Sequence, residues 1–324
     1  MSAYLMVYFK DDTHSIHFAI SNDGYTFTDV NSGNPVIKGD TIALQKGVRD
    51  PYITRGEDGI FYLVMTDLHI FGLERGIRNS QWDRSEKDFG WGNNTSIILM
   101  KSKDLKHWTH TILDVSLSFP SMRNIGCAWA PELIYDDNKK RYMVYLTMRF
   151  GSGLNKIYYA YLNKSFDALE TEPKLLFQYP KTHTSYIDAD IIKVKDKFHM
   201  FYVPHDGVAG IKQAISRKIN KGYRYFGNWT DPEAKACEAP SVWKRIGEDK
   251  WVLMYDIYGI NPHNFGFSET TDFITFKDLG HFNEGVMKTT NFTSPKHGSV
   301  IHLTAKEADE LSAFWKSSRK SHTQ

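Results

Sequence analysis

The stretch DPYITRGEDGIFYLVMT, residues 50–66, reads as a short apolar strand, a charged turn with glycine, and a second strand rich in aromatic and branched residues. This order is typical of a β-hairpin. The same pattern recurs three times, as APELIYDDNKKRYMVYLT (130–147), DADIIKVKDKFHMFYV (188–203) and APSVWKRIGEDKWVLMYD (239–256). A hairpin that repeats at intervals of roughly 50 to 80 residues indicates a modular β architecture.

A second element follows some of these hairpins. It reads SNDGYTF at 21–27, SKDLKHW at 102–108 and, more loosely, SETTDFITF at 268–276. Serine and aspartate followed by an aromatic residue indicate a turn and then an outer strand, because the polar side chains can bond the turn backbone. The two elements together make units of about four strands, which are typical of propeller blades.

The two ends of the chain complete the count of blades. Strands expected near residues 3–9, 15–21 and 25–30 form a blade without an innermost strand, and HGSVIHLT at 297–304 can supply it. Such closure protects strand edges. We therefore predict an all-β fold, a five-bladed β-propeller made by residues 1–304. Residues 305–324 are predicted to form an amphipathic helix and tail packed on it, with Ala308, Leu311 and Trp315 at helical spacing.

The composition limits the kind of partner. The chain has 41% hydrophobic residues, a formal charge of +2 and no apolar run long enough for a membrane span, so we expect neither nucleic acid nor a membrane as partner. The 14% aromatic content suits strands and stacking on sugar rings. Cys127 and Cys237 lack disulfide or zinc spacing and are expected to be free thiols. We expect a monomer. The first residues do not resemble a signal peptide, so a cytoplasmic protein and a trimmed exported protein both stay open.

The hairpin register brings distant residues together. Innermost strands of a propeller run parallel around a central channel, so equivalent positions meet near one end. Alignment on the Pro of RDPYI, WAPEL and EAPSV gives two adjacent layers. The first layer holds Asp50, Ala130, Asp188, Ala239 and Gly298, and the second holds Arg49, Trp129, Ile187, Glu238 and His297.

Three carboxylates in these layers indicate a chemistry. Two of them facing each other across a pocket suit glycosidic bond cleavage, where one protonates the leaving oxygen and the other activates water. A third nearby raises the proton affinity of the acid by like-charge repulsion. Asp50, Asp188 and Glu238 are therefore the candidate catalytic residues, and Trp129 offers a face for a sugar ring.

At this point RDPYI, WAPEL, YIDADI, EAPSVW and HGSV, in this order, resemble the five blade-start motifs of glycoside hydrolase family 43. The resemblance covers nearly the whole chain. It implies an inverting glycosidase for arabinose-, xylose- or galactose-containing plant glycans, with oligo- or polysaccharide substrates. It implies Asp50 as general base, Glu238 as general acid and Asp188 as the residue that orients the acid and tunes its pKa. His297 matches a histidine that holds a central water or calcium ion, and no other cofactor is expected.

The sequence departs from the family pattern at two positions. Ala239 follows the acid where the family often has Gly, and Ala189 follows Asp188 where it often has Pro. Asp190 is therefore a rival for the role of Asp188. Asp11 and Asp12 are weaker rivals for the base, because they are expected in a hairpin turn.

Several further residues are candidates for substrate contact. Residues 66–94 form either a rim loop with Trp82 and Trp91 as sugar platforms or a solvated insertion. Arg123 and Arg149 either bond sugar hydroxyls or cap strands. We include Arg49, Trp129, Trp91 and Arg123 as predicted substrate-binding residues. Surface or loop roles are expected for His69, His205 and His263, which show no metal-ligand spacing.

Three alternatives to this hypothesis remain. A propeller that binds glycans without catalysis would need only stacking aromatics. A fructan hydrolase would need an early Asn-Asp-Pro-Asn motif, which NSGNPV does not match. A mannoside phosphorylase would need a basic cluster for phosphate, and the predicted layers contain only Arg49. The sequence does not choose the sugar, the linkage, or exo against endo action.

Overall fold

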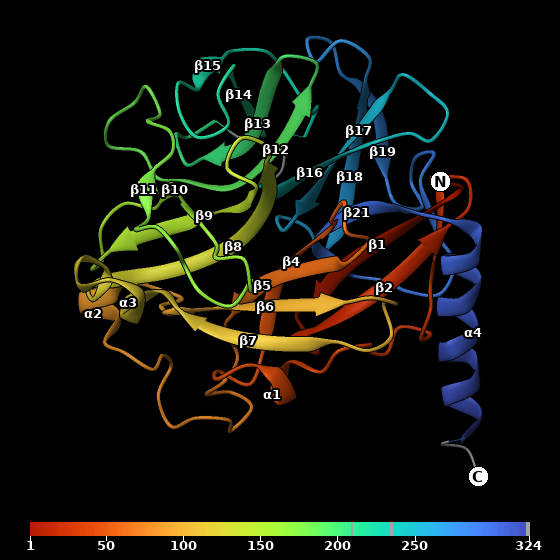
Figure 1. Ribbon diagram of the computed structural model, residues 1–324, viewed down its shortest axis with the longest axis horizontal. Coiled ribbons are helices and arrows are strands. Elements are labelled where there is room, and N and C mark those ends of the chain that lie inside the picture. The colour runs from red at the N-terminus through yellow and green to blue at the C-terminus, as the bar shows by residue number, and fades with distance from the viewer. Residues whose placement is uncertain (209, 234–235, 322–324) are drawn as a thin grey trace.

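The four predicted hairpins form the inner strand pairs of four blades in the computed structural model, which describes residues 1–208, 210–233 and 236–321. Blades 2 to 5 are sheets of four antiparallel strands, blade 1 has a fifth short strand, and the five blades surround a central axis (Figure 1). The predicted five-bladed β-propeller is therefore confirmed. No helix in these described ranges is long and apolar enough to span a bilayer.

The blades follow one another along the chain. Blade 1 contains β1 (Ala3–Lys10), β2 (Ser15–Ser21), β3 (Thr26–Asp29), the short parallel β20 (Lys288–Thr289) and β21 (Lys296–Leu303). Blade 2 contains β4 (Val48–Arg55), β5 (Phe61–Asp67), β6 (Ser96–Ser102) and β7 (Thr109–Asp114). Blade 3 contains β8 (Ile125–Asp136), β9 (Arg141–Phe150), β10 (Lys156–Tyr161) and β11 (Lys174–Leu175). Blade 4 contains β12 (Tyr186–Val194), β13 (Lys197–Pro204), β14 (Lys212–Ser216) and β15 (Arg224–Phe226). Blade 5 contains β16 (Glu238–Lys244), β17 (Trp251–Ile257), β18 (Asn264–Thr270) and β19 (Lys277–His281).

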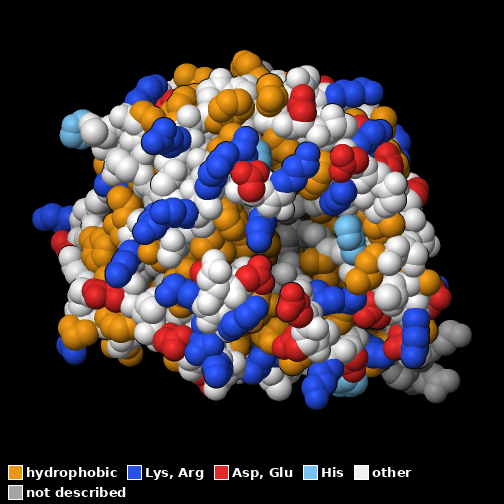
Figure 2. Space-filling view, turned by 45° about the horizontal axis from the view of Figure 1, so that its top comes forward, with side chains coloured by type: hydrophobic (Ala, Val, Ile, Leu, Met, Phe, Trp, Pro, Cys, Tyr) orange, Lys and Arg blue, Asp and Glu red, His pale blue; other side chains and the backbone are white. Residues whose placement is uncertain are grey.

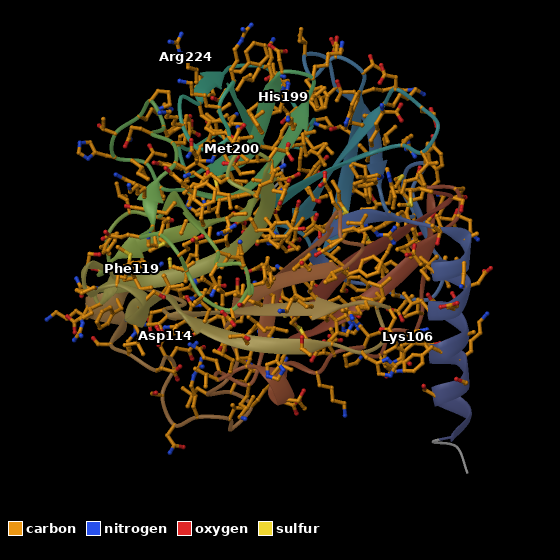
Figure 3. All side chains as sticks on the ribbon, in the orientation of Figure 1. Lys106, Asp114, Phe119, His199, Met200 and Arg224 are labelled. Carbon is orange, nitrogen blue, oxygen red and sulfur yellow. The ribbon has the colours of Figure 1, made fainter. Side chains whose placement is uncertain are left out.

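Short helices lie in the connections. They are α1 (Gly39–Ile42), α2 (Glu86–Phe89), α3 (Val115–Ser118) and the 3-10 helix η1 (Pro120–Met122). Asp114 ends β7 and caps α3, because its side chain accepts the backbone N–H of Ser116 (Figure 3). This cap gives the chain a sharp turn from blade 2 toward blade 3.

The ring is closed by the last strand, as predicted. β21 pairs antiparallel with β1, with Tyr4 opposite His302 and Val7 opposite Ser299. The first and last strands thus share one sheet, and β21 takes the innermost position beside β4 and β16. Closure removes the free inner edge that blade 1 would otherwise expose.

Apolar clusters lie between neighbouring blades and hold the ring together. Between blades 2 and 3, for example, Val64 and Ile97 pack with Leu133 and Val144, all nearly inaccessible to solvent. Burial of each such side chain contributes about 1.5–3 kcal/mol to stability. Equivalent clusters fill the other four interfaces.

The C-terminal helix α4 (Ala305–Ser321) runs along the outside of blade 1 (Figure 1). Ala308 and Leu311 are buried in the cluster between blades 1 and 2, and Trp315 packs against it. Lys106 lies beside the helix and forms an ion pair with Glu310, with 3.4 Å between Nζ and Oε2 (Figure 3). The predicted helical spacing is confirmed.

Each innermost strand contains a β-bulge near its start, and the bulged residue has a left-handed backbone. The φ angles are 54° at Asp50, 43° at Ala130, 53° at Asp188, 56° at Ala239 and 24° at His297. Left-handed non-glycine residues cost roughly 1–2 kcal/mol each, and such strain is found at functional sites. The five bulged residues form the first of two layers around the channel.

The predicted register of the fifth motif is wrong by one residue. His297, and not Gly298, occupies the bulge position equivalent to Asp50, and Lys296 takes the position equivalent to Glu238. Gly298 lies one step deeper, where an added Cβ would come within 2.3 Å of the Val7 carbonyl oxygen. Gly298 is therefore needed for the close contact between β21 and β1 and not for the left-handed conformation of the bulge.

Candidate active site

A cavity of about 470 Å³ opens where the five innermost strands begin. We call the second layer of these strands the mouth ring; it consists of Arg49, Trp129, Ile187, Glu238 and Lys296, and all five line the cavity. The bulge layer adds Asp50 and Asp188. The structure therefore brings the three predicted catalytic residues together from three blades. Figure 2 shows one face of the molecule, on which basic and acidic side chains surround a central hollow.

Asp50 is held in its ionised form. Its Oδ2 accepts a hydrogen bond from Thr66 Oγ1 at 2.7 Å, and its Oδ1 lies 3.2 Å from His297 Nδ1. Burial opposes ionisation, but the charges of His297 and Arg49 and these two hydrogen bonds outweigh it and lower the pKa of Asp50 to about 2. A carboxylate in this state can accept a proton from water.

Asp188 and Glu238 hold protons more tightly. Burial raises the pKa of Asp188 to about 8 against the opposing charge of His297, and the neighbouring charges of Glu238 and Asp50 add to the rise. Burial also raises the pKa of Glu238, and the charge of Asp256, opposite it across the β16–β17 pair, acts in the same direction. Lys296 and Arg49 partly offset these effects on Glu238. One site thus holds one carboxyl group with a lowered pKa and two with raised pKa values.

Asp190, the rival for Asp188, does not line the cavity. Its Oδ2 accepts the backbone N–H of Val242 at 2.5 Å, and its side chain bonds to Glu132 deeper in the channel. The side chain joins blade 4 to blades 3 and 5. Asp190 is therefore placed to hold blades together, and Asp188 keeps the position beside the other two acids.

Tryptophans form one wall of the cavity. Trp129 donates its indole N–H to the Gly92 carbonyl at 2.9 Å, and Trp91, which is 53% exposed, meets it edge-on with ring centroids 5.9 Å apart. Leu68 and Ile70 from the same insertion also line the cavity, so residues 66–94 form a rim loop. Trp82 is buried and bonds Glu86, so it offers no sugar platform.

Of the three arginines considered in the sequence analysis, Arg49 and Arg149 line the cavity and Arg123 does not. Arg123 is exposed at the end of η1 and does not line the cavity, because the chain turns outward there before β8. Arg149 lines the cavity instead and fixes the rim loop, with its guanidinium bonded to the carbonyls of Phe89 and Trp91 and stacked over Trp129 at 4.7 Å. Arg49 lies in the ring as predicted, with Nη1 bonded to Asp11 at 2.8 Å.

His297, the predicted ligand of a water or calcium ion, contacts Asp50 in the structure. Asp50 outweighs the effect of burial and raises the pKa of His297, which favours an imidazolium that stabilises the Asp50 carboxylate. In the part of the chain that the structure describes, no group of three or more His, Cys, Asp or Glu side chains is placed to hold a metal ion. No step of the chemistry below depends on an ion.

The comparison with protein families now decides which family the chain represents. A family model for glycoside hydrolase 43-related proteins, described as "Probable glycosyl hydrolase domain", matches residues 1–309. The chain belongs to this family. The resemblance drawn from the five motifs is confirmed.

Individual relatives of this family 43-related chain are distant. An α-L-arabinofuranosidase of Bifidobacterium longum subsp. longum is 28% identical over 158 residues, which are 46% of this chain and 13% of that protein. The chain matches only this small part of that relative. A family 43 structure from Bacillus licheniformis is 14% identical, with a TM-score of 0.56 over 94% of this chain and 57% of that one. An α-L-arabinofuranosidase structure from Clostridium thermocellum is 15% identical, with a TM-score of 0.54 over 82% of each chain. At these identities the two structures show a shared fold.

Sequence reasoning missed several residues around the cavity of this family 43-related chain. Lys296 was missed because of the one-residue register error. Asp11 was expected in a hairpin turn and was only a weak rival for the base, yet it lies at the cavity and bonds Arg49. His205, Tyr258 and His263 reach the cavity from loops, where strand register gives no information. A search for polar residues just outside strand ends could have found them.

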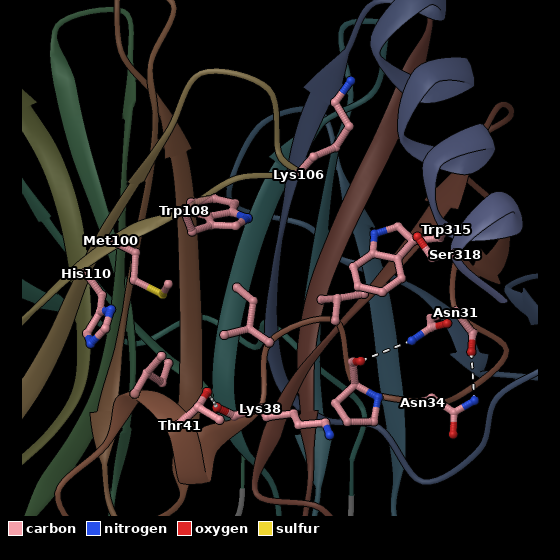
Figure 4. A pocket seen from close by; sticks show the side chains of 14 residues that line it. Asn31, Asn34, Lys38, Thr41, Met100, Lys106, Trp108, His110, Trp315 and Ser318 are labelled. Atoms are coloured by element: carbon pink, nitrogen blue, oxygen red, sulfur yellow. Dashed lines mark hydrogen bonds between the residues drawn. The ribbon is translucent and has the colours of Figure 1, made fainter. Parts of the chain in front are cut away.

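A second, larger cavity of about 720 Å³ lies between the first two blades and α4. Figure 4 shows Trp108 and Trp315 on its walls, with Lys38 and Thr41 below them. Its lining contains no aspartate or glutamate. This cavity cannot supply the acid and base that glycoside cleavage requires, so the mouth ring remains the candidate active site of the family 43-related chain.

Proposed function

We propose that this chain is an inverting glycoside hydrolase that cleaves arabinose-, xylose- or galactose-containing glycans. The observation that carries the proposal is that three carboxyl groups line one cavity and differ in pKa. The pKa of Asp50 is lowered to about 2, and those of Asp188 and Glu238 are raised. General acid and general base catalysis needs two groups with different pKa values, one that keeps its proton and one that is ionised. Family membership supports the same reaction class.

The proposed reaction uses both acids in one step. Glu238 gives its proton to the glycosidic oxygen as the bond to the sugar breaks, while Asp50 takes a proton from the water that attacks the same carbon. Afterwards Glu238 is ionised and Asp50 is protonated, and exchange with solvent restores both. Above its pKa of about 8, Asp188 is itself ionised and repels the charge that forms on Glu238, which favours return of the proton. Trp129 and Trp91 would stack on the sugar.

Arabinofuranosides are the first substrates to examine, because the Bifidobacterium and Clostridium relatives are named α-L-arabinofuranosidases. The test compares aryl arabinofuranosides, xylosides and galactosides, then plant oligosaccharides, with product stereochemistry followed by NMR. Hydrolysis with inversion supports the proposal. Oligosaccharide binding without hydrolysis would favour a binding protein, and a retained configuration would contradict direct attack by water.

Removal of either acid should abolish most turnover. Asp50→Asn removes the base and Glu238→Gln the acid, and each is expected to lower kcat by roughly 100- to 10 000-fold, the usual contribution of a general acid or base. Thermal unfolding of both variants checks that the fold is intact. Near-normal turnover in a folded variant would remove that residue from the mechanism.

A second candidate is phosphorolysis, because the cavity contains Lys296 and Arg149 in addition to Arg49. Arg49 and Arg149 are already bonded to Asp11 and to backbone carbonyls, which favours hydrolysis. The two reactions differ in product. Formation of a sugar 1-phosphate in phosphate buffer, absent in other buffers, would establish phosphorolysis in place of hydrolysis.

A further inference from the structure

Lys296 and Arg49 are the charged members of the mouth ring that the proposed reaction leaves without a direct role, and Arg49 is already bonded to Asp11. Lys296 is the first residue of β21, and β21 lies between β16, which carries Glu238, and β4, which carries Asp50. Its side chain therefore enters the cavity between the strand of the acid and the strand of the base. A sugar that reacts with both must pass next to this ammonium group.

The Lys296 ammonium forms long ion pairs with two carboxylates but no short hydrogen bond to either. Its Nζ lies 3.5 Å from Asp256 Oδ2 and 3.9 Å from Asp11 Oδ2, beyond the range of about 2.7–3.2 Å for a good N–H···O hydrogen bond. The side chain is only 5% exposed. An ammonium has three N–H donors, and among the described residues none of them has a hydrogen-bond acceptor at that distance.

Asp256 fixes the direction of this side chain. Asp256 is fully buried, and its Oδ2 also accepts the backbone N–H of His297 at 3.3 Å. The negative charge holds the ammonium on the cavity side of β17, since a charge of opposite sign compensates burial of the cation. Arg49 differs, because its bond to Asp11 at 2.8 Å engages the guanidinium directly.

We propose that Lys296 is a substrate-binding residue, whose ammonium donates hydrogen bonds to hydroxyl oxygens near the reacting carbon of the sugar between Glu238 and Asp50. This inference rests on the proposed glycosidase function. A charged donor bonds a hydroxyl more strongly than a neutral donor does. A buried donor left unpaired is costly, so the site would select against sugars that lack the matching hydroxyl.

The first experiment replaces the ammonium with an apolar group of similar length. Lys296→Met is expected to lower kcat/KM on aryl glycosides by about 10- to 100-fold, the usual worth of a hydrogen bond to a charged group, mainly through KM. A series of singly deoxygenated glycosides then identifies the hydroxyl. Removal of the hydroxyl that Lys296 binds should lower kcat/KM of the wild type most, whereas the same removal should change kcat/KM of Lys296→Met very little. Lys250→Met is the matched control, because Lys250 is exposed and far from the mouth ring, and its kinetics should stay unchanged.

Three results would overturn the inference. One is an unchanged KM and kcat/KM in a folded Lys296→Met variant, with folding checked by thermal unfolding. Another is a shift of the pH profile without a change in KM, which would mean that Lys296 acts only through Glu238. A loss seen only in reactions with added phosphate would likewise assign Lys296 to phosphate and not to sugar.

A binding measurement separates this inference from the proposed function. Titration calorimetry with arabinose, xylose and galactose uses Glu238→Gln, which cannot turn over substrate, with and without Lys296→Met. Binding that depends on Lys296 supports the inference even if the wild type hydrolyses no glycoside. Hydrolysis by the wild type, together with equal binding by the two variants, refutes the inference and leaves the proposed function standing.

Discussion

Asp50 and Asp188 carry the same side chain at equivalent bulge positions of two blades, yet their pKa values move in opposite directions. The difference comes from their neighbours. Asp50 contacts His297 and Thr66, which favour the charged form, whereas Asp188 is buried next to Glu238. Equivalent backbone positions therefore hold carboxyl groups whose pKa values are shifted in opposite directions.

The pKa shifts of single residues predict how activity depends on pH. Activity should persist at low pH until Asp50 is protonated or the protein unfolds, and it should fall as pH rises through the raised pKa of Glu238. Above its pKa of about 8, Asp188 is ionised and carries a like charge beside Glu238. Asp188→Asn removes this charge, so the pKa of Glu238 should fall and the alkaline limb of kcat/KM should move to lower pH. Measurement of kcat/KM against pH for both proteins checks this. An alkaline limb at the same pH in the variant would show that Asp188 does not tune the acid.

The sequence predicted the three acids because each lies at a repeated position of a blade. Arg49 and Trp129 were found for the same reason. Lys296 was not found, because the fifth motif lacks the proline that anchors the other alignments and carries a glycine one step later. Tyr258 lies on a loop whose path depends on packing that the repeat does not encode.

At the scale of elements, the shared bulge explains why glycine suits the position that Ala239 occupies in this chain. Ala239 follows the acid with φ of 56°, a conformation that glycine adopts without strain. The family often has Gly there. Ala239 is buried, but it lies outside the apolar clusters between blades.

This bulge leads to a stability prediction. Ala239→Gly should raise the free energy of unfolding by about 0.5–1 kcal/mol, because relief of left-handed strain exceeds the entropy cost of glycine. Ala128→Gly in β8 is the control, since Ala128 has no left-handed φ and packs in the cluster between blades 2 and 3, and it should lower stability. Chemical denaturation measures both. A loss of stability in Ala239→Gly comparable to that of the control would contradict the strain argument.

At the scale of the whole molecule, the ring and the helix were predictable because both depend on apolar patterning. The pairing of β21 with β1 followed from a missing strand, and the helix from the spacing of Ala308, Leu311 and Trp315. Other features of the whole molecule were not predictable. The rim loop, for example, is fixed by the contacts of Arg149 with its carbonyl groups, which depend on the final fold.

The helix should contribute to the stability of the entire propeller. Leu311 is fully buried in the cluster that joins blades 1 and 2, so Leu311→Ala should lower the free energy of unfolding by about 2–5 kcal/mol. Lys306→Ala, on the exposed side of the same helix, should change it by less than about 0.5 kcal/mol. Chemical denaturation of both variants provides the measurement. Equal stability in the two variants would mean that α4 is not part of the cooperative unit.

Closure by β21 also sets an order of events during protein synthesis. The acid, the base and the wall of the cavity come from strands that the ribosome makes early or midway, but Lys296 and His297 arrive with the strand made after all others of the ring. Blades 2 to 5 can fold while the chain is still growing, since domains form as their segments emerge. The finished cavity, by contrast, requires β21 to find β1 across the ring. A nascent chain that lacks this strand would thus carry its three acids with no histidine beside the base, and we expect it to stay without activity until synthesis has passed residue 303.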